Sequence, residues 1–190
     1  GLLALSPPQS DGADVRMRYF TADGSRATMC GNGARCLARY ARQAGITAEP
    51  LVFDTDGGRY TADAPAEGDV RLHVPPPRGF GEVTLRDSAL DGPTYGIWTG
   101  TEHTVRFVED AGAAPVDTEG PAIRRDAALT PAGANVNFVQ IEASGEGGPA
   151  RIRARTFEKG VEAETLACGT GALASALAAR LSGRLGASEV

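Results

Sequence analysis

Lysine is almost absent from this chain: of its 19 basic residues, only Lys159 is not arginine. A pyridoxal-phosphate enzyme needs a Schiff-base lysine and a phosphate cradle, so the scarcity of lysine disfavours that class. An excess of positive charge is also lacking, because the formal net charge is −5 and the only adjacent basic pair is Arg124 and Arg125. Nucleic acid is therefore not an expected partner, since a phosphate-binding surface needs clustered cations.

Long apolar runs and paired cysteines are lacking too. No run approaches the roughly 20 apolar residues that cross a bilayer, so we expect no membrane partner and a cytoplasmic location. The three cysteines, Cys30, Cys36 and Cys168, are an odd number, which does not suggest the disulfide framework of a secreted protein. A zinc site is not predicted, because five residues separate Cys30 from Cys36 and no histidine follows at ligand spacing.

A run of three prolines, Pro75 to Pro77, divides the chain. Such a run favours an extended segment that interrupts sheet hydrogen bonding, so we place a domain boundary there, between domains 1–77 and 78–190. Helical spacing of apolar residues predicts one helix in each domain, at 34–44 and at 171–181, the second with Leu173, Leu177 and Leu181 four residues apart. Strand-like patterns occur at 15–20, 51–54, 59–62, 70–74, 95–98, 104–108, 137–141 and 152–157.

The pattern Cys-Gly-polar-Gly-Ala occurs twice, at 30–34 and at 168–172, each time directly before a predicted helix. Glycines allow close approach of a ligand, and the exposed N–H groups at a helix start attract anions such as a carboxylate. The same partial positive charge favours the thiolate form of a cysteine. Two such thiols at one site form an acid and base pair, suited to removing a proton from one face of a carbon and replacing it on the other.

Each cysteine also has a simpler interpretation as a small buried apolar residue. We keep that interpretation for Cys36, which we expect on the apolar face of the first helix with Tyr40, opposite the outward-facing Arg35, Arg39 and Arg42. Either pentapeptide alone would be weak support, because glycine-rich turns are common, but the pair is more specific. Neither carries the Gly-Lys-Ser/Thr ending of a P-loop or a full dinucleotide fingerprint.

Two longer segments around these cysteines resemble the signatures of the diaminopimelate epimerase family. The first runs from Arg18-Tyr19-Phe20-Thr21-Ala22-Asp23-Gly24-Ser25 to Met29-Cys30-Gly31-Asn32-Gly33-Ala34-Arg35-Cys36. The second runs from Glu158-Lys159-Gly160 to Glu164-Thr165-Leu166-Ala167-Cys168-Gly169-Thr170-Gly171-Ala172, and Asn135-Val136-Asn137-Phe138 lies between them. The resemblance covers nearly the whole chain.

The resemblance implies an α/β (α+β) fold of two similar domains, each a curled sheet around a central helix, with the active site in the cleft between them. It implies an amino acid as the small-molecule substrate and a reaction that uses neither pyridoxal phosphate nor a metal. Cys30 and Cys168 would be the acid/base thiols. The residues that would bind the substrate are Thr21, Gly31, Asn32, Asn135, Glu158, Lys159, Gly169 and Thr170. For Asn135 and Glu158 the simpler interpretations are a turn residue and a solvated charge at a strand end.

The chain departs from the family pattern at three places. Thr21 stands where Asn is common before Ala-Asp-Gly, Gly100-Thr101-Glu102-His103 replaces Gly-Asn-Pro-His, and Glu158-Lys159-Gly160 replaces Glu-Arg-Gly. Arginine grips a carboxylate with two parallel hydrogen bonds, whereas lysine is a point charge, so Lys159 would hold a distal carboxylate less firmly or hold another group. His103 either orients a catalytic group or is structural.

The expected reaction is inversion at the α-carbon, between LL- and meso-diaminopimelate in lysine and peptidoglycan precursor biosynthesis. Two alternatives are another cofactor-independent racemase or isomerase of this fold and a non-catalytic binding relative. A thiol redox protein is disfavoured, because no two cysteines lie two residues apart. The sequence leaves the oligomeric state open, a homodimer included. We expect a family strand segment before Gly1, with its own substrate-binding asparagine, and a closing strand after Val190.

Overall fold

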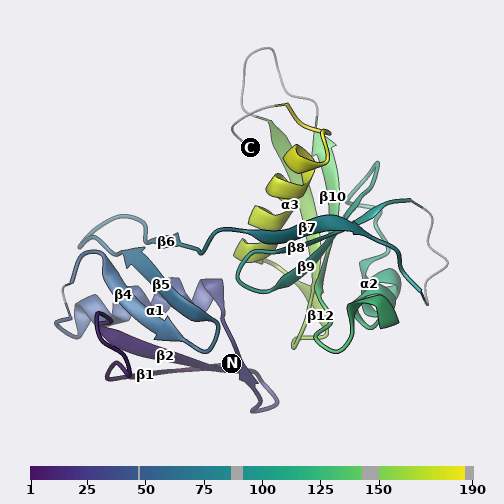
Figure 1. The fold of residues 1–190 in the computed structure, drawn as a ribbon. Coiled ribbons are helices and arrows are strands. Elements are labelled where there is room, and N and C mark those ends of the chain that lie inside the picture. The colour runs from purple at the N-terminus through teal and green to yellow at the C-terminus, as the bar shows by residue number, and fades with distance from the viewer. Residues whose placement is uncertain (47, 87–91, 143–149, 187–190) are drawn as a thin grey trace. The chain divides into compact units, whose positions relative to one another are not determined.

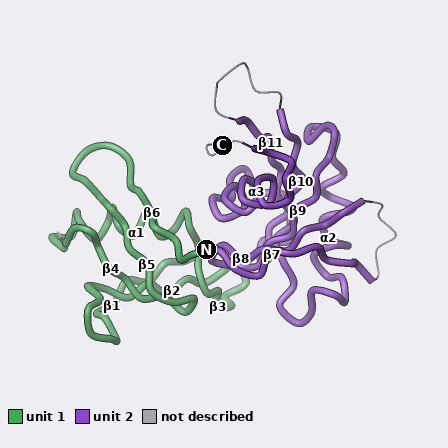
Figure 2. Tube along the Cα trace, turned by 45° about the horizontal axis from the view of Figure 1, so that its top comes forward, with its two compact units in different colours: residues 1–76 green, residues 77–190 purple. Residues whose placement is uncertain are grey.

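The computed structural model describes residues 1–46, 48–86, 92–142 and 150–186. The chain forms two compact units, Gly1–Pro76 and Pro77–Val190, which divide within the proline run (Figure 2). Each unit contains a six-stranded sheet with helical elements packed on it. The prediction of an α/β fold with two similar, sheet-dominated domains is confirmed.

Unit 1 has the strand order β1-β2-β4-β5-β6, with β3 paired to β2. The strands β2 and β4 are parallel and the other pairs are antiparallel, and the helix α1 lies in the connection between β2 and β4 (Figure 1). The bounds are β1 Leu2–Ser6, β2 Val15–Phe20, β3 Arg26–Ala27, α1 Gly31–Gln43, β4 Leu51–Thr55, β5 Gly58–Asp63 and β6 Arg71–His73.

The core of unit 1 lies between this sheet and α1. Alternation along the strands turns Val15 and Met17 of β2 inward, and Phe53 of β4 stacks on Tyr60 of β5 with ring centroids 6.0 Å apart. The helix contacts β1, β2, β5 and β6, and its buried residues are Gly33, Ala34, Leu37, Ala38 and Ala41. Small residues dominate this list, which allows the helix to lie close to the sheet.

The expectation for Cys36 was wrong. Cys36 is exposed and Tyr40 is 60% exposed, because the buried stripe of α1 follows positions 34, 37, 38 and 41. Helical geometry places residues 36 and 40 beside this stripe, where they line a surface pocket of about 420 Å³ with Leu3, Leu5 and Leu37. The apolar character of cysteine and tyrosine suggested burial, but the register of the helix on the sheet decided otherwise.

Unit 2 has the strand order β12-β11-β10-β9-β8-β7, in which only the β9–β10 pair is parallel among the pairs of the described strands. The helix α2 lies in the connection between β9 and β10 (Figure 1). The bounds are β7 Arg78–Val83, β8 Thr94–Trp98, β9 Glu102–Phe107, α2 Val116–Arg124, a 3₁₀ turn Ala127–Leu129, β10 Asn135–Glu142, β11 Arg151–Glu158, β12 Ala163–Thr165 and α3 Gly169–Leu181.

The central strand β10 is buried on both faces. Val136 and Phe138 pack in a cluster with Val116 and Ile123 of α2, whereas Val139 packs in a second cluster with residues of α3. Because side chains alternate along a strand, Asn135 and Asn137 share the face of Val139. This alternation directs two buried asparagines toward the helix that begins after Cys168.

The predicted strands and helices are present with shifted ends, and six described elements were not predicted: the strands β1, β3, β7 and β12, the helix α2 and the 3₁₀ turn. The strand β1 lacks an alternating pattern, and β7 follows the prolines with two glycines. The helix α2 contains Gly120 and Pro121, which normally interrupt helices. A Cβ on Gly120 would lie 2.7 Å from Cβ of Phe157, so this glycine is needed for close packing of α2 on β11.

The core-facing side of α3 is also made of small residues. Gly171, Ala174, Ser175, Ala178 and Ala179 are buried, whereas Leu181 is 53% exposed. The leucines four residues apart indicated a helix correctly, and Leu177 packs against the cluster that contains Val139, whereas Leu181 lies largely in solvent. In the described segments no helix combines the length and apolar character needed to cross a bilayer.

Substitutions in α1 test the corrected register. Leu37→Ala should lower the free energy of unfolding by about 2–5 kcal/mol, because it removes a side chain that is 4% exposed. The neighbouring Cys36→Ala should change it by less than about 0.5 kcal/mol, because Cys36 is exposed. Urea unfolding followed by circular dichroism measures both. Similar losses from the two variants would contradict the register.

Candidate active site

The helix α1 begins directly after Cys30. This residue is the N-cap, with extended backbone angles of φ −138° and ψ 110°, and its Sγ accepts a hydrogen bond from the N–H of Gly33 at 3.4 Å. Cys30 is half-buried. The thiol therefore lies at the positive end of a 13-residue helix, where a negative charge is stabilised.

The helix α3 begins in the same way after Cys168. The backbone of this N-cap is extended, with φ −128° and ψ 98°, and the helix also has 13 residues. Cys168 is half-buried, and its Sγ lies 3.6 Å from Oγ1 of Thr170. The two thiols thus share a backbone setting but have different hydrogen-bond partners. All three cysteines of the chain are thiols rather than disulfides.

The second glycine of each motif lies in close contact with the sheet, most tightly at Gly171. A Cβ on Gly33 would lie 3.0 Å from both Cδ atoms of Leu3, and one on Gly171 would lie 2.5 Å from Oδ1 of Asn137 and 3.1 Å from Sγ of Cys168. Gly169 differs, because a Cβ there would meet nothing within 4 Å. The second motif therefore combines a packing glycine, Gly171, with a glycine that faces open space, Gly169, where a ligand could reach the helix start.

Two predicted substrate-binding residues of unit 1 make contacts within their own segments. The hydroxyl of Thr21 donates to Oδ1 of Asp23 and lies 2.7 Å from Oγ of Ser25, closing the turn after β2. The hydrogen bond from Thr21, followed by those from Ser25, lowers the pKa of Asp23 to about 2. Asn32 is exposed in the first turn of α1 beside Gly31, and its Oδ1 accepts from Arg35 at 2.8 Å.

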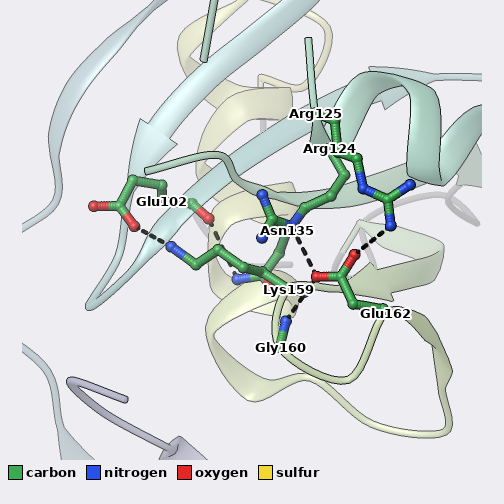
Figure 3. Close-up of polar contacts among 7 residues, drawn as sticks. All are labelled: Glu102, Arg124, Arg125, Asn135, Lys159, Gly160 and Glu162. Carbon is green, nitrogen blue, oxygen red and sulfur yellow. Dashed lines mark hydrogen bonds and ion pairs between the residues drawn. The ribbon is translucent and has the colours of Figure 1, made fainter. Parts of the chain in front are cut away.

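In unit 2, Asn135 joins two backbone segments. It is 3% exposed; its Nδ2 donates to the carbonyl of Glu102 at 3.3 Å, and its Oδ1 accepts from the N–H of Lys159 at 2.8 Å (Figure 3). Asn135 is the first residue of a strand rather than a turn residue. It fixes the turn that begins at the half-buried Lys159, directly after the half-buried Glu158 at the end of β11.

The same turn is held from the other side by Glu162. Its Oε1 accepts from the N–H of Gly160 at 3.1 Å, and its two oxygens pair with Arg124 and Arg125 at 3.2 and 3.1 Å (Figure 3). Burial alone would raise the pKa of Glu162, but these hydrogen bonds and charges outweigh it and lower the pKa. The adjacent arginine pair seen in the sequence therefore has a structural role within unit 2.

Two of the departures from the family pattern contact each other. Nζ of Lys159 lies 2.6 Å from Oε2 of Glu102 (Figure 3). The hydroxyl of Thr101 donates to the same oxygen at 3.3 Å. Burial alone would raise the pKa of Glu102, but the hydrogen bond and charge of Lys159 outweigh it and lower the pKa. Glu102 is therefore charged at neutral pH, and it compensates the positive charge of Lys159.

His103 lies between this ion pair and the Cys168 helix. Its Nε2 is 3.0 Å from Oγ1 of Thr170, and its Nδ1 is 3.1 Å from Nδ2 of Asn137. Burial, followed by the charge of Lys159, lowers the pKa of His103 to about 3 against the opposing effect of Glu102, so the ring is neutral at physiological pH. Thr99 also donates to the carbonyl of Thr170 at 2.9 Å.

Asn137 is the residue at this site to which the sequence assigned no role. It is completely buried between His103 and the start of α3. One signal was present, because Asn137 is a polar residue in the middle of an apolar strand and shares a face with Asn135. The described residues contain no group of three or more His, Cys, Asp or Glu side chains arranged to hold a metal ion.

A pocket of about 420 Å³ opens within unit 2 beside Glu102 and His103. Ile97, Trp98 and Leu129 give it a mostly apolar lining. The guanidinium of Arg78 covers the Trp98 ring at 3.9 Å from its centroid. The pocket can take an aliphatic group next to the Glu102–Lys159 pair.

Comparison with known proteins gives the family. Residues 2–77 and 95–190 match the family model described as diaminopimelate epimerase. The chain is 42% identical over 194 residues to the diaminopimelate epimerase of Chlorobaculum tepidum, covering 98% of this chain and 68% of that protein. It is 39% identical over 184 residues to that of Aquifex aeolicus, covering 96% and 64%. The chain thus spans about two thirds of the length of these relatives.

Solved structures show the same fold. A probable proline racemase from Agrobacterium radiobacter K84 aligns with a TM-score of 0.71 at 21% identity, covering 99% of this chain and 62% of that chain. A hydroxyproline epimerase from Agrobacterium vitis aligns with a TM-score of 0.65 at 17% identity, covering 97% and 61%.

The two glycines of the second motif provide a matched test of the packing. Gly171→Ala should lower the free energy of unfolding by about 1–3 kcal/mol, because its Cβ would overlap Oδ1 of Asn137. Gly169→Ala should not destabilise the protein, because its Cβ would enter open space. Thermal unfolding by calorimetry compares the two. An equal loss in both variants would show that the packing of α3 on β10 is not the cause.

Proposed function

Because the chain belongs to the diaminopimelate epimerase family, we propose that it inverts the α-carbon of LL-diaminopimelate to give meso-diaminopimelate, a step of lysine and peptidoglycan precursor biosynthesis. One observation carries the proposal. Cys30 and Cys168 are both half-buried N-caps of 13-residue helices, so each unit supplies a thiol at the positive end of a helix.

The proposed reaction is a transfer of one proton on each face of the α-carbon. One thiolate takes the α-proton, so that the C–H bond breaks, an S–H bond forms, and the electron pair moves toward the α-carboxylate. The other thiol then gives its proton to the opposite face and becomes a thiolate. No atom is gained or lost, and the two cysteines finish with exchanged protonation states.

The weak acidity of the α-carbon is the main barrier to this reaction. Negative charge that builds on the α-carboxylate needs fixed hydrogen-bond donors and protection from water. The first turns of α1 and α3 offer exposed backbone N–H groups, and Gly169 leaves open space beside one of them. Gly31, Asn32, Gly169 and Thr170 bind the carboxylate in this proposal, which uses neither pyridoxal phosphate nor a metal.

Inversion requires the two thiols to approach one α-carbon from opposite sides. The proposal therefore requires Cys30 and Cys168 to meet at a single bound substrate. Both must also remain reduced, because an oxidised sulfur can neither take nor give a proton. A cytoplasmic location suits this requirement, since that compartment keeps thiols reduced.

The Glu102–Lys159 pair supports a second candidate substrate class. A distal carboxylate that binds Lys159 must first displace Glu102, which lies 2.6 Å away. An amino acid without a distal carboxylate would leave the pair intact and could place an aliphatic side chain in the neighbouring pocket. The second candidate is therefore a cofactor-independent racemase of the same fold that acts on such an amino acid.

Deuterium incorporation tests the two-thiol reaction. In D₂O the chain should exchange the α-proton of diaminopimelate and invert its configuration, as measured by mass spectrometry and chiral chromatography. Cys30→Ala and Cys168→Ala should each reduce inversion at least about 100-fold, because each removes one proton-transferring group.

The third cysteine provides the control. Cys36→Ala should retain inversion, because Cys36 is exposed in the second turn of α1 and lies outside both helix starts. Any α-proton exchange that persists in Cys30→Ala should be confined to one stereoisomer of diaminopimelate, and any that persists in Cys168→Ala should be confined to the other. Absence of exchange with every amino acid in a panel would refute the enzymatic function.

Glu102→Gln tests the role of the ion pair. Freeing Lys159 should lower the KM for diaminopimelate several-fold and leave the KM for a neutral amino acid unchanged. Glu142→Gln is the matched control, because it breaks the Glu142–Arg153 pair at the opposite end of β10. An unchanged KM for diaminopimelate in Glu102→Gln would show that Lys159 does not bind the distal carboxylate.

A further inference from the structure

The two thiols are held by different groups. The sulfur of Cys30 accepts from a backbone N–H, that of Gly33, whereas the sulfur of Cys168 lies 3.6 Å from the hydroxyl of Thr170. Asn32 occupies the position in the first motif that Thr170 occupies in the second, and its side chain contacts Arg35. The chemical difference between the two helix starts therefore centres on Thr170 and the residues that hold it.

The direction of the hydrogen bonds behind Thr170 can be derived from Asn137. A backbone carbonyl can only accept, so the contact of 2.8 Å to the carbonyl of Thr104 identifies Nδ2 as the atom on that side of the amide. The hydroxyl of Thr156 donates to Oδ1 at 2.9 Å, which agrees with this orientation. Nδ2 must then also donate to Nδ1 of His103, 3.1 Å away.

This donation determines the tautomer of His103. A ring nitrogen that accepts a hydrogen bond carries no proton, so the proton of the neutral ring is on Nε2. Nε2 therefore donates to Oγ1 of Thr170 at 3.0 Å. With one lone pair of this oxygen engaged, its own proton can point toward Sγ of Cys168.

We propose that Asn137 and His103 are positioning residues that orient the Thr170 hydroxyl as a hydrogen-bond donor to Cys168. Cys168, as a thiolate, accepts from the Thr170 hydroxyl, whereas Cys30 accepts from the backbone N–H of Gly33, so the two thiols have chemically different donors. The inference rests on the proposed function only in naming Cys168 as a proton-transferring thiol. It assigns His103 a fixed neutral form, in which it acts as a donor and not as a base.

Alkylation of a single thiol tests the donor. In a Cys30→Ser, Cys36→Ser background, iodoacetamide reacts with Cys168 alone, and its rate against pH gives the midpoint of thiolate formation. Thr170→Val should raise that midpoint by about one pH unit, which is about tenfold slower reaction at lower pH, because it removes a hydrogen bond to the charged form. Thr170→Ser should restore the midpoint, because it retains the hydroxyl.

The positioning role of His103 is tested by two amides of different length. His103→Gln can place a donor near the position of Nε2. It should therefore keep the midpoint of Cys168 thiolate formation close to the value measured with His103 present. His103→Asn reaches only the position of Nδ1 and should behave as Thr170→Val does. In a Cys36→Ser, Cys168→Ser background, Cys30 should show the same midpoint with and without the substitutions at His103 and Thr170. This control separates the effect of the His103–Thr170 hydrogen bond on Cys168 from a general loss of structure.

Nitrogen-15 NMR of the unsubstituted chain gives a second measurement that needs neither a variant nor a substrate. The chain has two histidines, and His103 should show a protonated Nε2 and an unprotonated Nδ1 that persist to below about pH 5. A proton on Nδ1, or equal alkylation midpoints for Thr170→Val and Thr170→Ser, overturns the inference. Failure of α-proton exchange with these results intact would count against the proposed function alone.

Discussion

Close approach of a helix start to the sheet beneath it is the constraint on which the position of each N-cap cysteine depends. In each unit the third residue after the cysteine is a glycine on which a Cβ would crowd the sheet, at 3.0 Å from the Cδ atoms of Leu3 in one case and 2.5 Å from Oδ1 of Asn137 in the other. The approach fixes where the first turn lies and therefore where the sulfur lies. Small residues along the buried sides of α1 and α3 extend the same close contact over the full length of each helix.

This constraint explains how two units with one motif obtain different chemistry. The backbone setting is shared, so both sulfurs are at the positive end of a helix. The element beneath differs, because Leu3 is apolar whereas Asn137 carries a hydrogen-bond network that reaches His103 and Thr170. A reaction that takes a proton on one face and gives it on the other does not require equal thiols, and this chain provides unequal surroundings for them.

The residues that bear on substrate choice in unit 2 contact one another and do not act singly. Thr101, Glu102 and Lys159 look like independent departures in the sequence, but the structure joins them through one carboxylate oxygen. Asn135 and Glu162 hold the same turn through backbone hydrogen bonds. Under the proposed function, specificity at this position depends on whether a ligand competes with Glu102 for Lys159, and a change at any one of these residues alters the contacts of the others.

The sequence by itself determined the two cysteine motifs, the helices that follow them and most of the strands, because these features depend on local spacing and on the identity of glycine and proline. Only the tertiary structure decided which side of α1 is buried, and it left Cys36 on the exposed side. It also formed α2 around Gly120 by packing against Phe157, and it brought His103 to Asn137 across adjacent strands. These outcomes follow from contacts between residues far apart in the chain, whose geometry depends on strand register and helix placement rather than on local sequence.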